Sequence, residues 1–158
     1  MKQYRIEIKW AVIFTVVALL WMVFERMMGW HDELIAKHAT YTNFFSIVAI
    51  AVFVFALIDK RNNFYGGKMT YKQGFMSGLI ISVIIALLTP LSQWITSTMI
   101  TPDYFTNAIN YAVESGQSTQ EQAEATFNLG SYIMAATLFG FIAGVLTTAI
   151  VAIFVRKS

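Results

Sequence analysis

The densest group of polar side chains follows the first apolar run of the chain. Its members are Glu25, Arg26, His31, Asp32, Glu33, Lys37 and His38. His31 and His38 lie seven positions apart, which places them on one face if the segment is helical, and Glu25 or Glu33 can approach them there. Two imidazoles and a carboxylate can bind a divalent metal ion. The spacing matches no established ligand pattern, however, and Lys37 interrupts it. We therefore expect a solvated outer turn and no cofactor, with His31 and His38 as the candidate metal ligands.

The other residue types that carry chemistry do not form a catalytic set. The chain has no cysteine, which excludes thiolate nucleophiles and thiolate metal sites. Gly66, Gly67 and Lys68 are too few for a phosphate-binding loop. The acids and histidines of the outer turn lack a companion nucleophile and a pocket. A net charge of +2 leaves no basic patch for a nucleic acid. We expect a protein that is not an enzyme and does not bind nucleic acid.

The composition predicts that membrane-spanning helices position these residues. Hydrophobic residues make up 57% of the 158 residues and charged residues only 13%, against roughly 45–50% and 25% in soluble domains. Continuous apolar runs, without the alternation of barrel strands, indicate helices. We expect an all-α integral membrane bundle of four transmembrane helices in a single domain, residues 1–158, with spans at about 10–28, 41–58, 73–94 and 130–155.

The distribution of Lys and Arg predicts the orientation of the bundle. All but two of the 11 basic residues precede the first span, lie between the second and third spans, or follow the fourth. Because basic residues accumulate on the cytoplasmic side, we expect a multi-pass protein of a bacterial inner membrane with both termini in the cytoplasm. Lys60, Arg61, Lys68 and Lys72 form a basic inner rim that can touch the headgroups of membrane lipids.

The third span is the most sharply bounded. Thr70 and Gln73 form a capping box at its start, and at about 1.5 Å per residue Gln73 to Gln93 covers roughly the thickness of a hydrocarbon core. Pro90 removes a helical amide, so we expect a kink there. A purely structural kink is the first interpretation. The alternative is a gate or ligand cleft lined by polar side chains near Pro90, which are Thr89, Ser92, Gln93 and Thr96.

Small residues recur every four positions in the two later spans. They are Gly74, Gly78, Ser82 and Ala86 in the third span, and Ala136, Gly140, Gly144, Thr148 and Ala152 in the fourth. Each series lies along one helix face, where small side chains let two backbones approach closely. We expect helix packing at Gly74, Gly78, Gly140 and Gly144 between these two spans, with packing between two copies of the chain as the alternative.

The second outer connection, at about residues 102–127, has the signals of a folded helical cap. Thr101 is the predicted N-cap of a short helix, and Phe105 and Ile109 lie on one apolar face of that helix. Gly116 predicts the end of this short amphipathic helix. A helix lying on the membrane is the first interpretation, and an element that docks a partner is the alternative.

A second capping box, Ser118 to Glu121, follows in the same connection. We expect the helix that it opens to continue without a break into the fourth span. The connection contains no Lys or Arg, and its acids are Asp103, Glu114, Glu121 and Glu124. Such an acidic cap suits a basic partner or a cation.

The chain resembles a known family, and the third span carries the clearest likeness. The segments GGKMTYKQGFMSGLIISVIIALLTPLSQWI and YFTNAINYAVESGQSTQEQAEATFN, followed by a glycine-containing last span, are similar to small four-helix inner-membrane proteins of Bacteroidota. That family is catalogued as a domain of unknown function, number four-one-nine-nine in its series. The resemblance covers nearly the whole chain. It implies four transmembrane helices, an inner-membrane location and no assigned activity or catalytic residue.

Two functions fit these observations. The first is a non-enzymatic accessory or scaffold subunit that acts through helix packing and the acidic outer cap, with a second copy or another membrane protein as its partner. The alternative is a small transporter, or a membrane protein that binds a lipid or small molecule near Pro90. We place no ionisable residue in the interior of a span, which argues against proton-coupled transport. A cavity between the spans at the level of Ala86 to Gln93 would favour the alternative.

Overall fold

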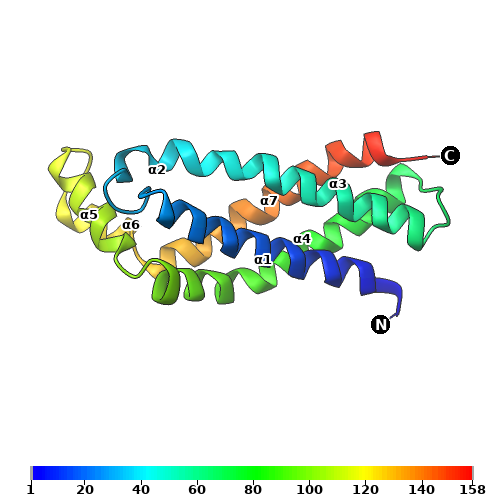
Figure 1. The fold of residues 1–158 in the computed structure, drawn as a ribbon, viewed down its shortest axis with the longest axis horizontal. Coiled ribbons are helices and arrows are strands. Elements are labelled where there is room, and N and C mark those ends of the chain that lie inside the picture. The colour runs from blue at the N-terminus through cyan, green and yellow to red at the C-terminus, as the bar shows by residue number, and fades with distance from the viewer. Residues whose placement is uncertain (1, 158) are drawn as a thin grey trace.

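The computed structural model describes residues 2–157, which fold almost entirely into helices (Figure 1). The α-helices are α1 (Arg5–Met27), α2 (Ile35–Tyr41), α3 (Phe45–Asn63), α4 (Tyr71–Ile95), α5 (Tyr104–Glu114), α6 (Gln120–Thr126) and α7 (Leu129–Val155). Short 3₁₀ turns precede α1 and α3, and a π-helical turn, Thr96–Ile100, follows α4. The described residues contain no strand, which confirms the predicted all-α class.

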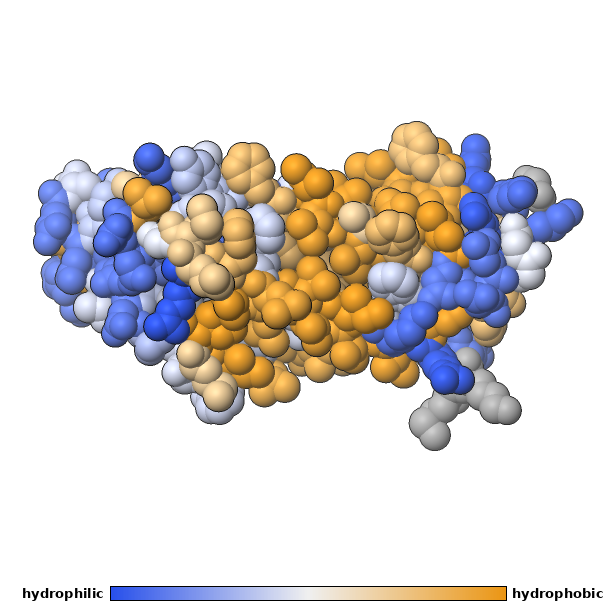
Figure 2. All heavy atoms as spheres, viewed as in Figure 1, coloured by the Kyte–Doolittle hydropathy of each residue, from blue (hydrophilic) through white to orange (hydrophobic). Residues whose placement is uncertain are grey.

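Within the described part of the chain, four segments are long and apolar enough to cross a membrane, as predicted. They are Arg5–Met27, Ile35–Asn63, Tyr71–Ile100 and Leu129–Val155. Apolar side chains cover the middle of the molecule and polar side chains gather at its two ends (Figure 2). Large apolar side chains of this middle band are exposed, among them Leu87 and Leu146. Such a surface suits hydrocarbon rather than water, as expected of a multi-pass membrane protein.

The two ends of the bundle are built differently. One end, which we call the cap end, carries α2, α5 and α6 (Figure 1). The opposite end, which we call the basic end, holds both described termini and the connection between α3 and α4 (Figure 1). Most of the basic residues lie at this second end, while the four acids of the outer connection lie at the cap end.

The four long helices form a ring in which α1 and α7 each pack against both α3 and α4, and the closest packing joins α4 to α7. Gly74, Gly78 and Gly144 lie in this contact. A Cβ atom on Gly78 would lie 2.9 Å from the Cβ of Thr148, and one on Gly144 would lie 2.6 Å from Ser82 Oγ. The two backbones are therefore closer than a larger residue at either position would allow.

Gly140 is a correction to the predicted stripe. It is exposed, and no atom lies within 4 Å of a Cβ atom added to it. The two helices have separated at this level, so the expected contact at Gly140 is not formed. The glycine instead faces cavities between the helices.

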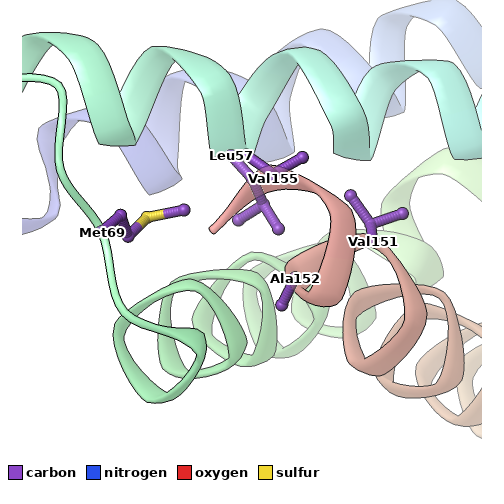
Figure 3. Close-up of a cluster of buried hydrophobic side chains, with 5 residues drawn as sticks. All are labelled: Leu57, Met69, Val151, Ala152 and Val155. Carbon is purple, nitrogen blue, oxygen red and sulfur yellow. The ribbon is translucent and has the colours of Figure 1, made fainter. Parts of the chain in front are cut away.

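A buried apolar cluster joins α3, α7 and the connection before α4 at the basic end (Figure 3). Its members are Leu57, Met69, Val151, Ala152 and Val155. Met69 also exchanges two backbone hydrogen bonds with Lys157, of 2.8 and 2.9 Å. These bonds hold the last described residues against the connection between α3 and α4.

Side-chain caps define where α4 and α6 begin. Thr70 and Gln73 form the predicted capping box at the start of α4, with the Thr70 amide donating to Gln73 Oε1 at 2.8 Å. The box at the start of α6 consists of Thr119 and Gln122. It therefore begins one residue after the predicted Ser118.

The expected continuous helix through α6 and α7 is wrong. Asn128 has an extended backbone, and its side-chain oxygen accepts a hydrogen bond from the Ser131 amide at 2.9 Å. Asn128 is thus the N-cap of a new helix, because a residue with extended dihedrals cannot continue the preceding one. This break separates α6 at the cap end from the membrane-spanning α7.

The outer connection is folded, with boundaries that differ slightly from the prediction. Asp103, rather than Thr101, occupies the N-cap position of α5, and its side chain makes no capping hydrogen bond. α5 ends at Glu114, and Gly116 follows with a φ of +70°, a conformation that favours glycine. α5 packs against α6 and α2, so its apolar face is turned toward the protein.

Candidate functional site

The cap end brings together three side chains that come from the end of α1 and from different parts of the turn between α1 and α3. Glu25 lies in the last turn of α1, His31 lies in the turns that follow, and His38 lies in α2. The chain reverses direction between these helices, so both imidazoles return to the carboxylate. The Nε2 atoms of His31 and His38 lie 2.9 and 3.2 Å from the same oxygen, Glu25 Oε2. We call these three residues the cap triad.

The cap triad is buried, which corrects the expectation of a solvated turn. Glu25 is 0% exposed and His31 is 2% exposed, while His38 is half-buried. Glu33 and Lys37, from the same stretch of sequence, do face solvent. The segment is therefore two-sided, with three ionisable side chains turned into the protein.

Neighbouring elements cover the cap triad from two sides. Asn107 of α5 donates hydrogen bonds to the carbonyl oxygen of His31 at 3.0 Å and to Asp32 Oδ1 at 2.8 Å. The Arg26 guanidinium donates to the carbonyl oxygen of Ile100, in the π-helical turn. The first contact fixes α5 over the turn, and the second ties the end of α1 to the end of α4.

Hydrogen bonds orient the members of the cap triad. The indole of Trp21 donates to Glu25 Oε1 at 2.5 Å, which leaves Oε2 for the imidazoles. When His38 Nε2 donates to Glu25, His38 Nδ1 is an acceptor, and the Tyr104 hydroxyl donates to it at 3.2 Å. The Tyr104 oxygen in turn accepts a hydrogen bond from the Tyr132 hydroxyl at 2.9 Å. Burial raises the pKa of Tyr104 above its ordinary value, and the neighbouring Tyr132 and Glu25 act in the same direction. Tyr104 therefore keeps its proton for this hydrogen bond.

The donor set of the cap triad has the composition of a metal site. The side chains of Glu25, His31 and His38 each offer one ligand atom, and these atoms lie within 4.8 Å of one another. Two imidazole nitrogens and one carboxylate oxygen form a ligand set found in zinc proteins. His31 Nδ1 is buried without a hydrogen-bond partner among the described residues.

A cavity of about 560 Å³ lies against the two histidines, and we call it the cap cavity. Its polar wall includes His31, His38 and Tyr104, together with Gln93 at the end of α4. Hydroxyl-bearing side chains also line it, which are Thr42, Thr96, Ser97, Thr101 and Tyr132. Its apolar lining consists of Met22, Ala39, Phe105, Phe127, Ala135, Ala136 and Phe139. The volume is within the range of roughly 300–1,000 Å³ that is usual for small-molecule sites.

Two further cavities lead from the cap cavity into the middle of the bundle. A middle cavity of about 240 Å³ shares Met22, Gln93, Thr96 and Ala136 with the cap cavity. A lateral cavity of about 320 Å³, between α3 and α7, shares Phe14, Phe45, Ile85 and Gly140 with the middle cavity. The cap cavity, beside the cap triad, thus adjoins the mostly apolar middle cavity, which in turn adjoins the lateral cavity.

The third span supplies polar side chains to this space, but Pro90 itself does not. Gln93 and Thr96 line both the cap and middle cavities, and Thr89 and Ser92 line the middle one. Pro90 is exposed and lines neither cavity. α4 runs on past Pro90 to Ile95. The expected site near Pro90 is therefore formed by neighbouring side chains of α4 and not by the proline itself.

The basic end contains a second buried group of charges, which the sequence analysis missed. Glu7 and Lys60 are 1% and 2% exposed, and Lys60 Nζ lies 2.8 Å from Glu7 Oε1. The Ser77 hydroxyl donates to the same oxygen at 2.8 Å, and Lys60 also donates to the Gln3 carbonyl oxygen at 2.9 Å. Lys60 therefore belongs to a buried ion pair between α1 and α3, rather than to the basic inner rim that was expected to touch lipid headgroups.

The predicted outer-cap residues separate into two groups. Asp103, Glu114, Glu121 and Glu124 are all exposed. Phe105 and Ile109 are half-buried, and the Phe105 ring packs edge-on against Tyr132 with centroids 5.0 Å apart. The apolar face of α5 thus covers the cap cavity, while its acids face outward. Tyr104 and Tyr132, which no sequence motif marked, complete the site.

Comparisons with known proteins place this arrangement in a family. The comparisons with the curated proteins and with the solved structures find no match. The match of a family model agrees with the resemblance inferred from the third span and the outer connection. The chain belongs to the family described as "Protein of unknown function (DUF4199)", whose model matches residues 9–157.

Proposed function

We propose that the protein binds a lipid or another amphiphilic small molecule in the cap and middle cavities. The observation that carries this proposal is their adjacency: the cap cavity, with polar side chains on its wall, and the mostly apolar middle cavity share four lining residues between the long helices. A scaffold that acts only through helix packing has no need for such a space. The cavity therefore favours the second of the two functions considered from the sequence.

The polar wall suits a headgroup that accepts and donates hydrogen bonds. His31, His38 and Tyr104 line one side of the cap cavity, and Gln93 and Ser97 line another. His31 Nδ1 is buried and has no partner among the described side chains and backbone groups. A buried polar atom without a partner is costly, so a ligand atom that pairs with it would bind favourably.

The inner part of the space suits a hydrocarbon tail. The middle cavity is lined largely by apolar side chains such as Phe14, Leu19, Phe45 and Ile85. An amphiphile that places its polar end beside the histidines would be enclosed by protein along most of its length, out of contact with water and lipid. Because a lipid tail in the bilayer is already out of water, the gain in the cavity comes from close packing against these side chains rather than from removal of water.

The test is retention of a small molecule by the purified full-length chain. Ala136 lines both cavities, so Ala136→Phe places a ring where they join. Ala51 lies on an exposed face of α3 outside the cap, middle and lateral cavities, and Ala51→Phe is the matched control. Native mass spectrometry after extraction in mild detergent should show a bound amphiphile on the wild-type chain and on the Ala51→Phe variant, but not on Ala136→Phe. Equal retention by both variants, or no retained molecule on the wild type, would refute the proposal.

The location proposed for this binding protein is a bacterial inner membrane, with several spans and both termini in the cytoplasm. The support is the basic end, which contains Arg5, Lys9 and Arg156, opposite a cap end whose exposed acids have few basic counterparts. Basic residues flank spans on the cytoplasmic side. In this orientation the cap cavity lies near the outer surface of the membrane, and the role is one of binding rather than catalysis.

An accessory role is the second candidate, and the exposed acids of the cap end favour it. Asp103, Glu114, Glu121 and Glu124 face solvent on α5, on α6 and on the loop before α5. Partners of this surface would be basic segments of another membrane protein. Co-purification of such a protein, lost when the four acids are changed to Lys, is the result that supports this candidate.

A further inference from the structure

We propose that Glu25, His31 and His38 bind a divalent transition-metal ion of the zinc class. This inference does not depend on the amphiphile. It rests on the side chains of the cap triad alone, and it departs from the sequence-based expectation that the protein has no cofactor.

The ligand atoms have the spacing that a metal ion requires. Two ligands at about 2.0–2.2 Å from a tetrahedral zinc ion lie about 3.3–3.6 Å from each other. In the cap triad, Glu25 Oε2 lies 2.9 Å from His31 Nε2 and 3.2 Å from His38 Nε2. All three ligand atoms lie within 4.8 Å of one another. To admit an ion, the two shorter separations must lengthen by a few tenths of an ångström, and the widest, which is at most 4.8 Å, must approach the tetrahedral spacing.

The charge of the site also favours a cation. Glu25 is a fully buried carboxylate, and a buried charge is stable only when it is paired. Among the described residues, its ion-pair partners are the two histidines, whereas Arg26 is engaged by the carbonyl oxygen of Ile100. A divalent ion would supply the positive charge that no Lys or Arg of the described chain brings to this carboxylate.

Outer hydrogen bonds hold two of the ligands in the orientation that coordination needs. His38 Nδ1 is bonded to the Tyr104 hydroxyl, which points Nε2 toward Glu25. Trp21 occupies Glu25 Oε1 and leaves Oε2 free for the ion. Hydrogen bonds to the other ring nitrogen of a metal-binding histidine commonly fix the orientation of its ring and raise its affinity for the metal. Three protein ligands also leave one position for water or another ligand, as in catalytic zinc sites.

The composition makes this proposal unusually easy to test. The chain contains two histidines and no cysteine, and both histidines belong to the cap triad. A zinc ion coordinated by imidazole can therefore bind at this site only. The experiment uses the full-length chain in nanodiscs, stripped of metal with a chelator and then titrated with Zn²⁺ in competition with a chromophoric chelator.

The expected result is one zinc ion per chain, with an X-ray absorption spectrum that shows two imidazole ligands and no sulfur. Glu25→Gln should weaken zinc binding at least tenfold, because it replaces the anionic ligand by a neutral amide of the same size. Glu33→Gln, which changes an exposed acid in the same turn, should leave the affinity unchanged.

Three results would overturn the proposal. They are substoichiometric zinc on the wild type, an absorption spectrum without imidazole ligands, or equal affinity in the Glu25→Gln and wild-type chains. If Glu25→Gln does not fold, the spectrum of the wild-type chain still decides the question. Loss of zinc binding from Glu33→Gln as well would show an adventitious surface site.

Discussion

The contact between α4 and α7 predicts that Gly78→Ala destabilises the bundle. A Cβ atom at this position would lie 2.9 Å from the Cβ of Thr148 and would also meet both γ atoms of that side chain. Rotation of the threonine side chain can move its γ atoms but not its Cβ, which is fixed to the α7 backbone. The substitution therefore forces α7 away from α4 along their closest contact.

The size of the effect follows from two opposing terms. Overpacking a core typically costs about 1–3 kcal/mol, whereas replacing a helical glycine by alanine favours the helix by roughly 0.5–1 kcal/mol. The net loss of unfolding free energy should be about 0–2.5 kcal/mol, with a middle value of about 1 kcal/mol. Reversible unfolding in detergent or bicelles, followed by circular dichroism or by steric trapping, measures this difference.

Gly140→Ala is the matched control on α7. No atom lies within 4 Å of its added Cβ, so only the gain in helix propensity remains. We expect this variant to be as stable as the wild type or more stable by roughly 0.5–1 kcal/mol. Equal stabilities for the Gly78→Ala and Gly140→Ala variants would refute the argument that α4 and α7 approach each other through Gly78.

Two further predictions concern the buried ion pair and the orientation. Lys60→Met leaves the carboxylate of Glu7 buried without its cation and should cost about 3–5 kcal/mol of unfolding free energy. Adding Glu7→Gln to this variant should recover most of the lost unfolding free energy. A Lys60→Met variant as stable as the wild type would show that the ion pair does not stabilise the bundle. For orientation, reporter fusions after Asn63 should be cytoplasmic and fusions after Ser118 should be exported, because basic residues flank the first position but not the second. The reverse pattern would reject the proposed topology.

The architecture could be predicted because its determinants are local. Apolar runs of bilayer length define the four long helices, and a capping box such as Thr70 with Gln73 marks a helix start within four residues. The break at Asn128 was missed although its signal is equally local. An asparagine three residues before a serine is common in sequences that form no N-cap, and the Gln, Glu and Ala residues before Asn128 favour a helix that continues. Only the extended backbone at Asn128 shows that two helices meet there.

The candidate site could be predicted only in part because its contacts are distant in sequence. His31 and His38 could be grouped by spacing, but their burial depends on α5, which begins more than sixty residues later. Tyr104 and Tyr132 enter the site from α5 and α7, and no local pattern relates them to a histidine in α2. Gly140 was misplaced for the same reason, since a four-residue repeat does not show where two helices separate.

The first helix shows how buried charge and membrane thickness fit together. Glu7 and Glu25 are eighteen residues apart, which is about five helical turns, so they lie on the same face of α1. Ala11 and Phe14, on this face, pack in the apolar core between the two acids. The two acids are separated by about 27 Å, close to the thickness of a hydrocarbon core. Each carboxylate is covered by another part of the chain and is paired there with Lys60 or with the histidines. A reading based on hydropathy alone assigns such residues to the aqueous connections, whereas the packing of α1 turns both of them inward.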